Sequence, residues 1–422
     1  MKANKKILFL CQVFYPDSTS TSQLFTSMFA DMVEEGIEIE VLCSFPSGDP
    51  SKAGLPRREM YKGVSIRRFG LRIDHKKSIV HRTLAYLGYM IPLAWTLLFR
   101  RRYGIVFGVT NPPFVAQILY LVSLVRRMPY QYMILDQYPE SLIALGMKRS
   151  SISARLWMWS NRLAYQKAEK MIVLGRDMTT LLVENYDIDR EKIVYIPHWS
   201  AVEAPDPLPI EESKMVDRLG LRDKIIFQYS GNMGMWHDID ILVRAAKEVE
   251  DDERIHFLLI GNGARLATAK ELSEKLDCRN ITWHPFVPLS EVRASLSSCH
   301  VAIISLRAGF EGVAVPSKLY GILMSGRGII AQVPAQTETA LQVEEDDCGI
   351  AVLPGDLEGL AGAIRELAAD PDRIARLGRN AFHAYKTKYT EAQAIDAFCD
   401  LWGIEFPSHE DATSVSSQHV GV

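Results

Sequence analysis

The sequence lacks the motifs that mark several classes of protein. Its six cysteines show no paired spacing, which argues against a zinc ribbon, a redox motif or a disulfide framework and predicts reduced, mostly buried thiols. No Gly-x-Gly-x-x-Gly follows the first expected strand, as a dinucleotide oxidoreductase would require. No helix-turn-helix, RNP or zinc-finger pattern appears, so no nucleic-acid partner is expected. The N-terminal apolar run is short and has no small-residue cleavage site, which favours a first β-strand over a signal peptide.

The composition is that of a globular protein, with 48% hydrophobic and 23% charged residues in a chain of 422, a length that suits two or three domains. The net charge of −3 hides an asymmetry. Residues 1–200 carry 27 Lys and Arg against 17 Asp and Glu, and the remainder carries 21 against 34. A basic first half predicts an anionic partner for that half. In the absence of a nucleic-acid motif, a membrane surface is favoured.

Strand-like runs alternate with helical stretches along nearly the whole chain. "KILFLCQ", "IEIEVLCS" and "GIVFGVT" are examples in the first half, and "KIIFQYSGN", "IHFLLIGNG" and "VAIISL" are examples in the second. A proline-rich segment with Pro205, Pro207 and Pro209 interrupts the alternation and is interpreted as a linker. The pattern predicts an α/β protein of two Rossmann-like, doubly wound domains, whose strand carboxyl ends face a common cleft. The predicted parts are residues 1–203, 204–388, a C-terminal helix over 389–406 that packs back on the first domain, and a disordered tail over 407–422.

Four loops after predicted strands are candidates for ligand contact. The hydroxyl-rich segment 18–22, which includes Thr21, is suited either to capping the next helix or to meeting an anion. Gly231 and Gly234 in "YSGNMG" allow close approach of the backbone to a ligand, ahead of a helix expected from about Asp238. In "IGNGARL", from Gly261, an ordinary tight turn and a ligand contact are both open.

The fourth loop, "FEGVAVPSKLYGILMSGRG", has the most specific pattern. Pro316 suits the first turn of a helix that runs to about Ser325, and it places Ser317 and Lys318 in that turn. A lysine at a helix N-terminus is unfavourable, because that end of the helix is already positive. A bound diphosphate would explain its position. Glu311 belongs to the loop that faces the same cleft.

In combination, these motifs resemble those of a retaining, nucleotide-sugar-dependent glycosyltransferase of family 4 with the two-domain GT-B fold. The resemblance covers nearly the whole chain and is nearest to bacterial enzymes of exopolysaccharide and O-antigen synthesis. It rests on "YPD" with the small residues that follow, "TNPPF", "DQYPESL", "YSGNMG" and "EGVAVPSK". It implies that Glu311 contacts hydroxyls of the donor sugar, and that Asp136 and Glu140 face the cleft to bind or help deprotonate the acceptor. For Glu140, capping of the next helix is an equal alternative.

The chain departs from the family pattern at the nucleotide. The second Glu of the family signature, which binds the ribose, falls on Leu319 or on Gly321, and neither side chain can accept a hydrogen bond. The usual Arg and Lys of the diphosphate site are replaced by Asn232 and His237. Lys318, with Arg307, is therefore expected to supply the missing positive charge.

The resulting candidate site has three parts and no metal. The catalytic candidates are Glu311, Asp136 and Glu140; the donor and phosphate candidates are Lys318, Ser317, Gly231, Asn232, Gly234, His237, Arg307 and Thr21; the nucleotide candidates are Gly261, Asn262, Val287 and Leu319. No cofactor is expected beyond the nucleotide-sugar substrate, because the resemblance implies metal-independent chemistry. The resemblance favours a UDP-sugar of the N-acetylhexosamine type over a GDP-sugar, and a polyprenyl-diphosphate-linked or glycan acceptor. A 2-epimerase of the same fold and a non-catalytic GT-B protein are the alternatives.

An apolar run with Pro92 inside it, Leu84 to Phe99, is too short to span a bilayer and is either a buried helix or a helix at a membrane surface. For the second reading, Tyr89 and Trp95 suit the interface, and nearby basic residues would meet anionic headgroups. Those basic residues are Arg67, Arg68, Arg72, Lys76, Lys77 and Arg100–Arg102. The prediction is a cytoplasmic protein bound peripherally to the inner face of the plasma membrane, with its oligomeric state left open.

Overall fold

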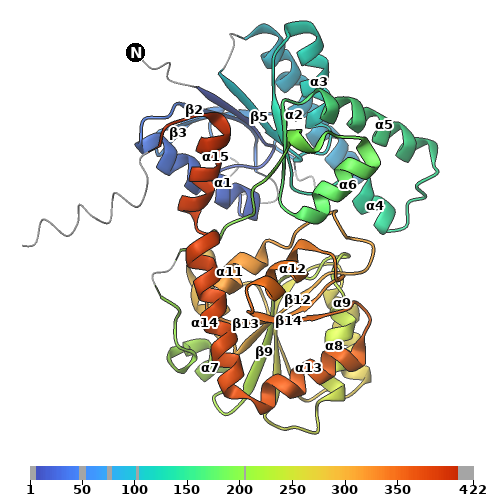
Figure 1. Ribbon diagram of the computed structural model, residues 1–422, viewed down its shortest axis with the longest axis vertical. Helices are drawn as coiled ribbons and strands as arrows, with labels where there is room; N and C mark the ends of the chain where they lie inside the picture. Colours follow the sequence, from blue (N-terminus) through green and yellow to red (C-terminus); the bar gives the residue numbers. More distant parts are fainter. Residues whose placement is uncertain (1–5, 47–53, 74–77, 101–103, 204–205, 407–422) are drawn as a thin grey trace, which may run out of the picture.

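The computed structural model describes residues 6–46, 54–73, 78–100, 104–203 and 206–406. Lys76, Lys77, Arg101, Arg102, Pro205 and the predicted tail lie outside these residues. The described chain forms two parallel-sheet α/β domains, one above the other in Figure 1. This confirms the predicted fold class of two doubly wound domains.

The first domain is built on an eight-stranded sheet in the order β3-β4-β2-β1-β5-β6-β7-β8. Its strands are β1 (Ile7–Leu10), β2 (Ile39–Ser44), β3 (Arg58–Tyr61), β4 (Val64–Phe69), β5 (Ile105–Val109), β6 (Gln131–Ile134), β7 (Lys170–Val173) and β8 (Ile193–Tyr195). Its helices are α1 (Ser20–Glu34), α2 (Ile79–Phe99), α3 (Val115–Arg126), α4 (Glu140–Ala144), α5 (Ile152–Lys167) and α6 (Arg176–Tyr186). All strand pairs are parallel except β3 with β4, which form a hairpin at the edge.

The second domain has a six-stranded parallel sheet in the order β11-β10-β9-β12-β13-β14. Its strands are β9 (Ile225–Asn232), β10 (Ile255–Asn262), β11 (Ile281–His284), β12 (Val301–Ser305), β13 (Gly328–Gln332) and β14 (Gly349–Val352). The helices from here to the C-terminus are α7 (Lys214–Leu219), α8 (Ile239–Glu248), α9 (Leu266–Lys275), α10 (Val292–Leu296), α11 (Lys318–Met324), α12 (Glu338–Glu345), α13 (Leu357–Ala369), α14 (Pro371–Lys388) and α15 (Glu391–Trp402). Short 3₁₀ turns lie at Arg190–Lys192, Ile210–Glu212 and Leu289–Glu291.

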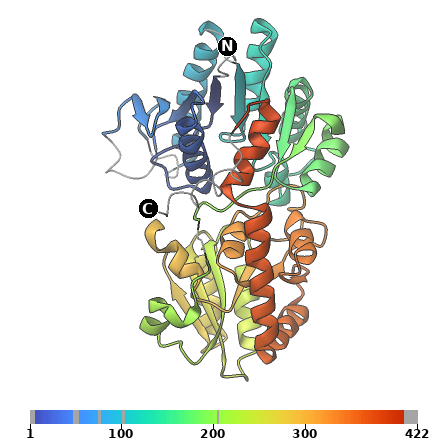
Figure 2. The same cartoon turned by 60° about the vertical axis from the view of Figure 1, so that its left-hand side comes forward.

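The last two helices run along both domains. α14 packs on the second domain against α11 and β13, and α15 contacts α1 of the first. Phe398 and Trp402 of α15 are buried in the same core as Phe25 of α1 and Phe107 of β5. Figure 2 shows this pair of helices passing from the lower domain to the upper one. The C-terminal helix therefore ties the two domains together.

The structure changes two details of the interfacial-helix prediction. Tyr89 does not reach an interface, because its side chain is fully buried and its hydroxyl donates to the Leu42 carbonyl oxygen at 2.9 Å. Arg68 does not face solvent either, since it is buried, donates to the Tyr15 carbonyl oxygen and pairs with Glu59 at 2.6 Å. In the part of the chain that the structure describes, no helix is long and apolar enough to cross a membrane.

Candidate active site between the two domains

A cavity of about 770 Å³ lies between the carboxyl ends of the two sheets. Ser18, Ser20, Gln23 and Asp136 line it from the first domain. From the second domain it is lined by the end of β9, the residues ahead of α8, the start of α11, and an apolar wall that contains Phe286, Val287 and Leu296. Its volume is within the usual range for a small-molecule site, and its position is the one expected for ligands of open α/β sheets.

Lys318 is the one cationic side chain among the described residues that line this cavity. It is the first residue of α11, where Ser317 is the N-cap, so α11 begins two residues later than Pro316 suggested. Its ammonium nitrogen is buried without a hydrogen-bond acceptor in the described chain, and it lies 3.8 Å from the centroid of the Tyr229 ring. Burial lowers the pKa of Lys318 to about 7. A buried, poorly compensated ammonium stabilises any anion that enters beside it.

Gly231 allows Lys318 to come close to the end of β9. Its φ is +140°, and a Cβ atom there would lie 3.2 Å from the Lys318 Nζ. A larger side chain would be strained and would crowd the amine. Gly234 is close to the side chain of Asn232, since a Cβ atom there would lie 2.9 Å from the Asn232 Nδ2. The end of β9 thus lies close to Lys318 and Asn232, whereas Gly234 does not line the cavity, and the donor contacts of this loop stay predictions.

His237 lines the cavity as a neutral ring. Its Nδ1 lies 2.6 Å from the Ser305 carbonyl oxygen, which only accepts, so Nδ1 carries the hydrogen. Burial first, and the charge of Lys318 second, lower the pKa of His237 to about 3. The ring therefore supplies Nε2 as a hydrogen-bond acceptor at neutral pH rather than a positive charge. Ser305 also accepts the Asp238 backbone N–H through its Oγ at 3.0 Å, which fixes the start of α8 at the predicted place.

Asp136 lies opposite, on the first domain, directly after β6. Burial raises the pKa of its carboxyl to about 6. Asp136 forms a β-bridge with Ala314, and the Gln137 backbone N–H donates to the Val313 carbonyl oxygen at 2.7 Å. These bonds bring a carboxyl that titrates near neutral pH to the wall opposite the α11 loop, where the sequence predicted an acceptor-side acid.

Glu140 does not face the cleft, contrary to the prediction. It is buried inside the first domain, where the Tyr186 hydroxyl donates to its Oε1 at 2.6 Å. The reason is that α4 begins at this residue and turns its side chain toward α6 and away from the cavity. The alternative of helix capping is not seen either, because the N-cap residue of α4 is Pro139 and α4 has no side-chain cap hydrogen bond.

Glu311, Arg307 and Thr21 do not line the cavity in this structure. The loop that carries Glu311 is held to the first domain by the next residue, since the Gly312 N–H donates to the Asp177 Oδ2 at 2.9 Å. The Glu311 side chain itself is exposed. At helix α1, Thr19 is the N-cap and accepts the Ser22 N–H, which agrees with the capping interpretation of this segment. The proposed ligand contacts of these three residues stay predictions.

Two of the nucleotide candidates have structural roles. A Cβ atom at Gly261 would lie 1.9 Å from the Gly231 carbonyl oxygen, because β9 and β10 pair through these two glycines and then through Asn232 and Asn262. The segment is therefore strand rather than the tight turn considered above, and neither Gly261 nor Asn262 lines the cavity. Leu319 is fully buried in the core of the second domain, so its side chain cannot meet a ribose. Of the nucleotide candidates, Val287 lines the cavity, as does Gly321, the other position considered for the second Glu.

The site also contains residues that the sequence did not indicate. Tyr229 supports the ammonium of Lys318, and Trp236 and Phe286 form apolar walls of the cavity. Tyr229 was not indicated because it is one buried residue of β9, and no local pattern shows that its ring lies beside Lys318. Phe286 is 55% exposed in a loop, a property that only the structure shows, so the sequence held no signal for it.

Comparison with known families identifies the chain. A glycosyl transferase 4-like domain matches residues 22–199, and a model described as glycosyl transferases group 1 matches residues 224–370. The two matches fall on the two domains and together cover most of the chain. The chain belongs to the family 4 glycosyltransferases. The cavity between the domains is therefore the candidate active site of a glycosyltransferase.

Two curated relatives are glycosyltransferases by name, and the name of one of them assigns it to colanic acid biosynthesis. This chain is 28% identical over 327 residues to the probable glycosyltransferase WbjE of Pseudomonas aeruginosa. The alignment covers 77% of this chain and 81% of WbjE. This chain is 23% identical over 378 residues to the putative colanic acid biosynthesis glycosyl transferase WcaI of Escherichia coli. That alignment covers 86% of this chain and 91% of WcaI.

Solved structures agree on the fold. Anabaena Alr3699/HepE in complex with UDP superposes with a TM-score of 0.68 at 15% identity and covers 94% of this chain and 99% of its own. WaaG, a glycosyltransferase involved in lipopolysaccharide biosynthesis, superposes with a TM-score of 0.68 at 14% identity and covers 93% and 99%. The glycosyltransferase thus has the predicted GT-B fold.

Proposed function

We propose that the glycosyltransferase moves a sugar from a UDP-sugar, of the N-acetylhexosamine type, to a hydroxyl of a lipid-linked or glycan acceptor in surface polysaccharide synthesis, with retention of the anomeric configuration. The observation that carries the proposal is the buried ammonium of Lys318 in the interdomain cavity. The name of WcaI, a putative colanic acid biosynthesis glycosyl transferase, supports a polysaccharide product, and the complexes of HepE with UDP and with UDP-glucose support the choice of uridine.

In this proposal, Lys318 binds the diphosphate of the donor. Its ammonium and the open backbone at Gly231 stabilise the negative charge that grows on the leaving phosphate as the bond from the anomeric carbon to the phosphate oxygen breaks. Ser317 and Asn232 add neutral hydrogen bonds, and the Nε2 of His237 accepts one from a sugar hydroxyl. The apolar wall at Phe286 and Val287 holds the base. No residue of the described chain is required to hold a metal in this scheme.

The acceptor enters from the side of Asp136. The hydroxyl oxygen of the acceptor attacks the anomeric carbon on the same face from which the leaving group departs. The proton of this hydroxyl passes to the departing phosphate oxygen. Asp136 orients that hydroxyl through a hydrogen bond, and its raised pKa suits it to share the proton. The reaction takes place at the inner face of the plasma membrane, where the basic first domain meets the lipid that carries the acceptor.

A nucleotide-binding experiment tests the proposal. Purified protein is titrated calorimetrically with UDP, GDP, ADP and dTDP, each with and without EDTA. UDP is expected to bind most tightly in both conditions, and Lys318→Ala is expected to weaken it about tenfold or more, as loss of a charge-assisted hydrogen bond would. Lys275→Ala, an exposed lysine of α9, is the matched control and keeps wild-type affinity.

Three outcomes would count against the proposal. Equal affinity of Lys318→Ala and wild type would remove Lys318 from the diphosphate site. Loss of UDP binding in EDTA would contradict the metal-independent scheme. Release of an altered free sugar from a UDP-sugar, with no acceptor present, would favour the 2-epimerase alternative.

A further inference from the structure

Helix α2 is apolar on both of its faces. One face is buried in the first domain through Tyr89, Leu93 and Leu97. The other face presents large apolar side chains that are 45% to 68% exposed. They are Val80, Leu84, Leu87, Ile91, Trp95 and Phe99. Their spacing of three and four residues places them in one stripe along the helix. Exposing such a continuous apolar stripe to water is energetically unfavourable.

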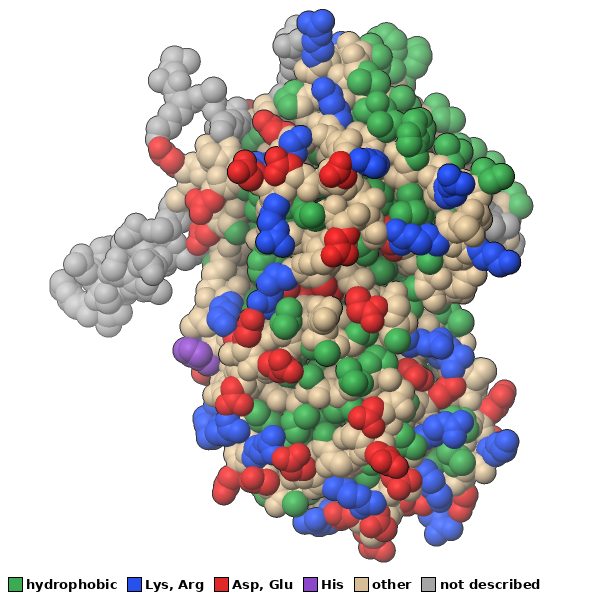
Figure 3. Space-filling view, turned by 45° about the vertical axis from the view of Figure 1, so that its right-hand side comes forward, with side chains coloured by type: hydrophobic (Ala, Val, Ile, Leu, Met, Phe, Trp, Pro, Cys, Tyr) green, Lys and Arg blue, Asp and Glu red, His purple; other side chains and the backbone are tan. Residues whose placement is uncertain are grey.

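The neighbouring helices extend this apolar surface. α3 contacts both α2 and α5, so the three helices lie side by side. α3 exposes Leu121, Leu124 and Val125, and α5 exposes Ile152, Leu156 and Trp159. Figure 3 shows hydrophobic side chains gathered on the upper, N-terminal half of the molecule, with Lys and Arg side chains at the margin. We call the exposed residues of α2, α3 and α5 named here the apolar face.

The charge of these three helices has one sign. Their sequences contain no Asp or Glu, whereas they contain Arg82, Arg126, Arg155, Arg162 and Lys167. An apolar face on helices whose own charged residues are all basic is complementary to a bilayer that contains anionic lipids. It is not complementary to itself, because a two-fold contact between copies would bring like charges together.

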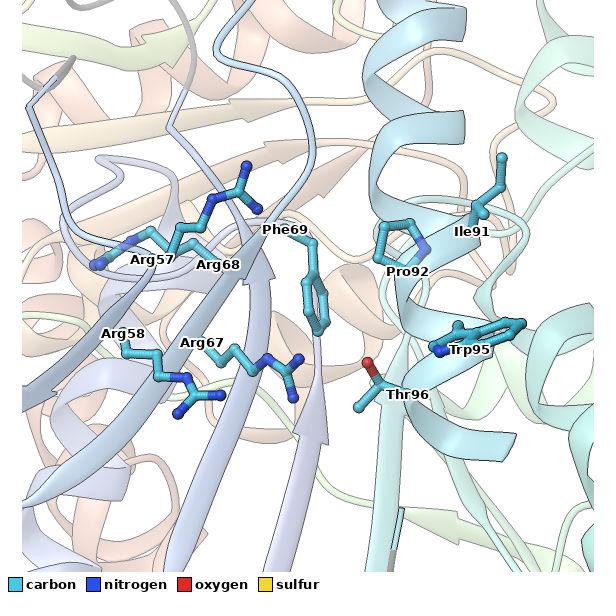
Figure 4. Close-up of a pocket in the computed structure, with 9 residues that line it drawn as sticks. All are labelled: Arg57, Arg58, Arg67, Arg68, Phe69, Ile91, Pro92, Trp95 and Thr96. Carbon is cyan, nitrogen blue, oxygen red and sulfur yellow. The ribbon is translucent and has the colours of Figure 1, made fainter. Parts of the chain in front are cut away.

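A basic pocket borders the apolar face. It has a volume of about 530 Å³ and is lined by four arginines from the β3–β4 hairpin and the residue before it, and by Ile91, Pro92, Trp95 and Thr96 of α2. Figure 4 shows the arginines on one side of the pocket and the α2 residues on the other. Ile91 and Trp95 belong both to the pocket and to the apolar face, so the two are continuous.

The arginines of the pocket are held close together by the sheet. Arg58 of β3 and Arg67 of β4 are direct partners in the antiparallel ladder, so their side chains leave the same face of the hairpin. Arg58 and Arg67 also line a smaller hollow together with Glu40, Glu59 and Arg100, so their charge is partly balanced there. No carboxylate is among the described residues that line this pocket.

The two carboxylates near the hairpin already have arginine partners. Glu59 pairs with Arg68, whose side chain is fully buried, and Glu40 pairs with Arg100. The guanidinium of Arg67 also lies 4.9 Å from the centroid of the Phe69 ring, which orients it beside α2. Arg100 and the four arginines of the pocket together outnumber these two carboxylates, which leaves an excess of positive charge at the edge of an apolar surface.

We propose that the pocket of Arg57, Arg58 and Arg67 binds the phosphate headgroup of an anionic phospholipid, whose acyl chains lie along the apolar face at Ile91 and Trp95. The inference rests on the proposed membrane location but uses none of the residues that line the transfer site. In this proposal the first domain binds preferentially to anionic lipids, and this binding brings the enzyme to the membrane surface that holds its acceptor. Arginine suits this role because its planar fork binds phosphate oxygens in pairs.

Vesicle binding tests the proposal. The full-length protein is sedimented with vesicles of phosphatidylcholine alone or with one quarter phosphatidylglycerol. Each basic side chain near an anionic surface strengthens binding about fivefold, so Arg58→Gln/Arg67→Gln is expected to bind the mixed vesicles about thirtyfold more weakly. The control Arg244→Gln/Arg379→Gln removes the same charge from exposed sites of the second domain and keeps wild-type binding. Trp95→Ser is expected to weaken binding to both vesicle types.

Further arms separate the possible failures. Glycerol phosphate at millimolar concentration is expected not to release the protein; release would show a site for soluble phosphates and overturn the lipid assignment. Wild-type binding of the arginine double variant to mixed vesicles would overturn the proposal as well. UDP affinity in the absence of vesicles should be unchanged in that variant, while Lys318→Ala should lose UDP and keep the vesicles. The two sites therefore fail independently.

Discussion

At the scale of single residues, the site combines two titratable groups whose environments move their pKa values toward neutrality from opposite sides. Burial disfavours the charged form of each group, so the pKa of Lys318 falls to about 7 and the pKa of Asp136 rises to about 6. His237, between Lys318 and Ser305, is held neutral. Such opposed shifts on the two walls of one cavity are typical of functional sites. The protonation of each residue can therefore be followed by measuring binding and rate as a function of pH.

The pKa of Lys318 predicts proton uptake on UDP binding. Above pH 7 the free enzyme holds Lys318 mostly neutral, whereas a bound diphosphate favours the ammonium. UDP affinity is therefore expected to fall as pH rises from 7 to 9, by up to about tenfold for each pH unit. Calorimetry at pH 8.5 in buffers of different ionisation enthalpy should show nearly one proton taken up. Lys318→Ala should abolish the uptake, and an uptake that survives this substitution would assign it to another group.

The pKa of Asp136 predicts an acidic limb in the rate. If its carboxylate assists the acceptor hydroxyl, kcat/KM should rise with pH up to about 6, before the separate fall that loss of the Lys318 ammonium causes above pH 7. Asp136→Asn should lower kcat at least about tenfold and remove this limb, with UDP affinity unchanged. Transfer to an acceptor, followed from pH 5 to 8, checks both effects. A limb that persists in Asp136→Asn would show that Asp136 only shapes the wall.

At the scale of elements, the alternation of strands and helices was readable because buried parallel strands are short apolar runs and the helices between them have a 3.6-residue period. Three strands were not predicted from the sequence, namely β3, β4 and β14. The β3–β4 hairpin is polar on one face, and its turn depends on positive φ at Lys62 and Gly63. The strand β14 has four residues and lies at the edge of its sheet. Short edge strands carry little periodicity, so their pairing is decided by the neighbouring strand.

The contact of β9 with β10 predicts a strong effect of Gly261→Ala. The Cβ atom of an alanine at position 261 would overlap the Gly231 carbonyl oxygen. The φ of Gly261, +143°, also disfavours any residue with a side chain. We expect the free energy of unfolding to fall by about 2–4 kcal/mol, and UDP affinity to fall with it because the Gly231 turn is displaced. Urea unfolding and UDP calorimetry measure the two effects. Gly362→Ala, in α13 with open space around it, is the control and should gain about 0.5–1 kcal/mol. Equal stability of the two variants would contradict the close strand contact.

At the scale of the whole molecule, the two domains are joined by a clamp that the sequence did not reveal. Arg176, at the start of α6, bonds the buried carboxylate of Glu338 through its backbone N–H and its guanidinium, and it also bonds Glu345. The Tyr195 hydroxyl donates to the same Glu338 Oε1 at 2.9 Å. These bonds link α6 of the first domain to α12 of the second. Together with α15, they determine how closely the two walls of the active site face each other.

The clamp predicts that Arg176→Ala opens the molecule. It would leave Glu338 buried without its cation, at a cost of about 3 kcal/mol in the free energy of unfolding. X-ray scattering should show a larger radius of gyration, and the KM for the donor should rise because the cavity needs both walls. Arg279→Ala is the control, since its pair with Asp277 is exposed to solvent and contributes little to stability. An unchanged radius of gyration and KM would mean that α15 alone sets the domain arrangement.

The sequence by itself determined the α/β alternation, the family, and the presence of Lys318 at the start of a helix beside a glycine-rich strand end. These features follow from local periodicity and from residue types whose chemistry is the same in any fold. Only the tertiary structure decided that Glu140 turns inward to Tyr186, that Leu319 joins the core and that His237 is neutral. It alone brought Arg176 to Glu338 and set the arginines beside α2. The physical reason is that burial and long-range pairing act between segments far apart in the chain, and no local pattern records which segments meet.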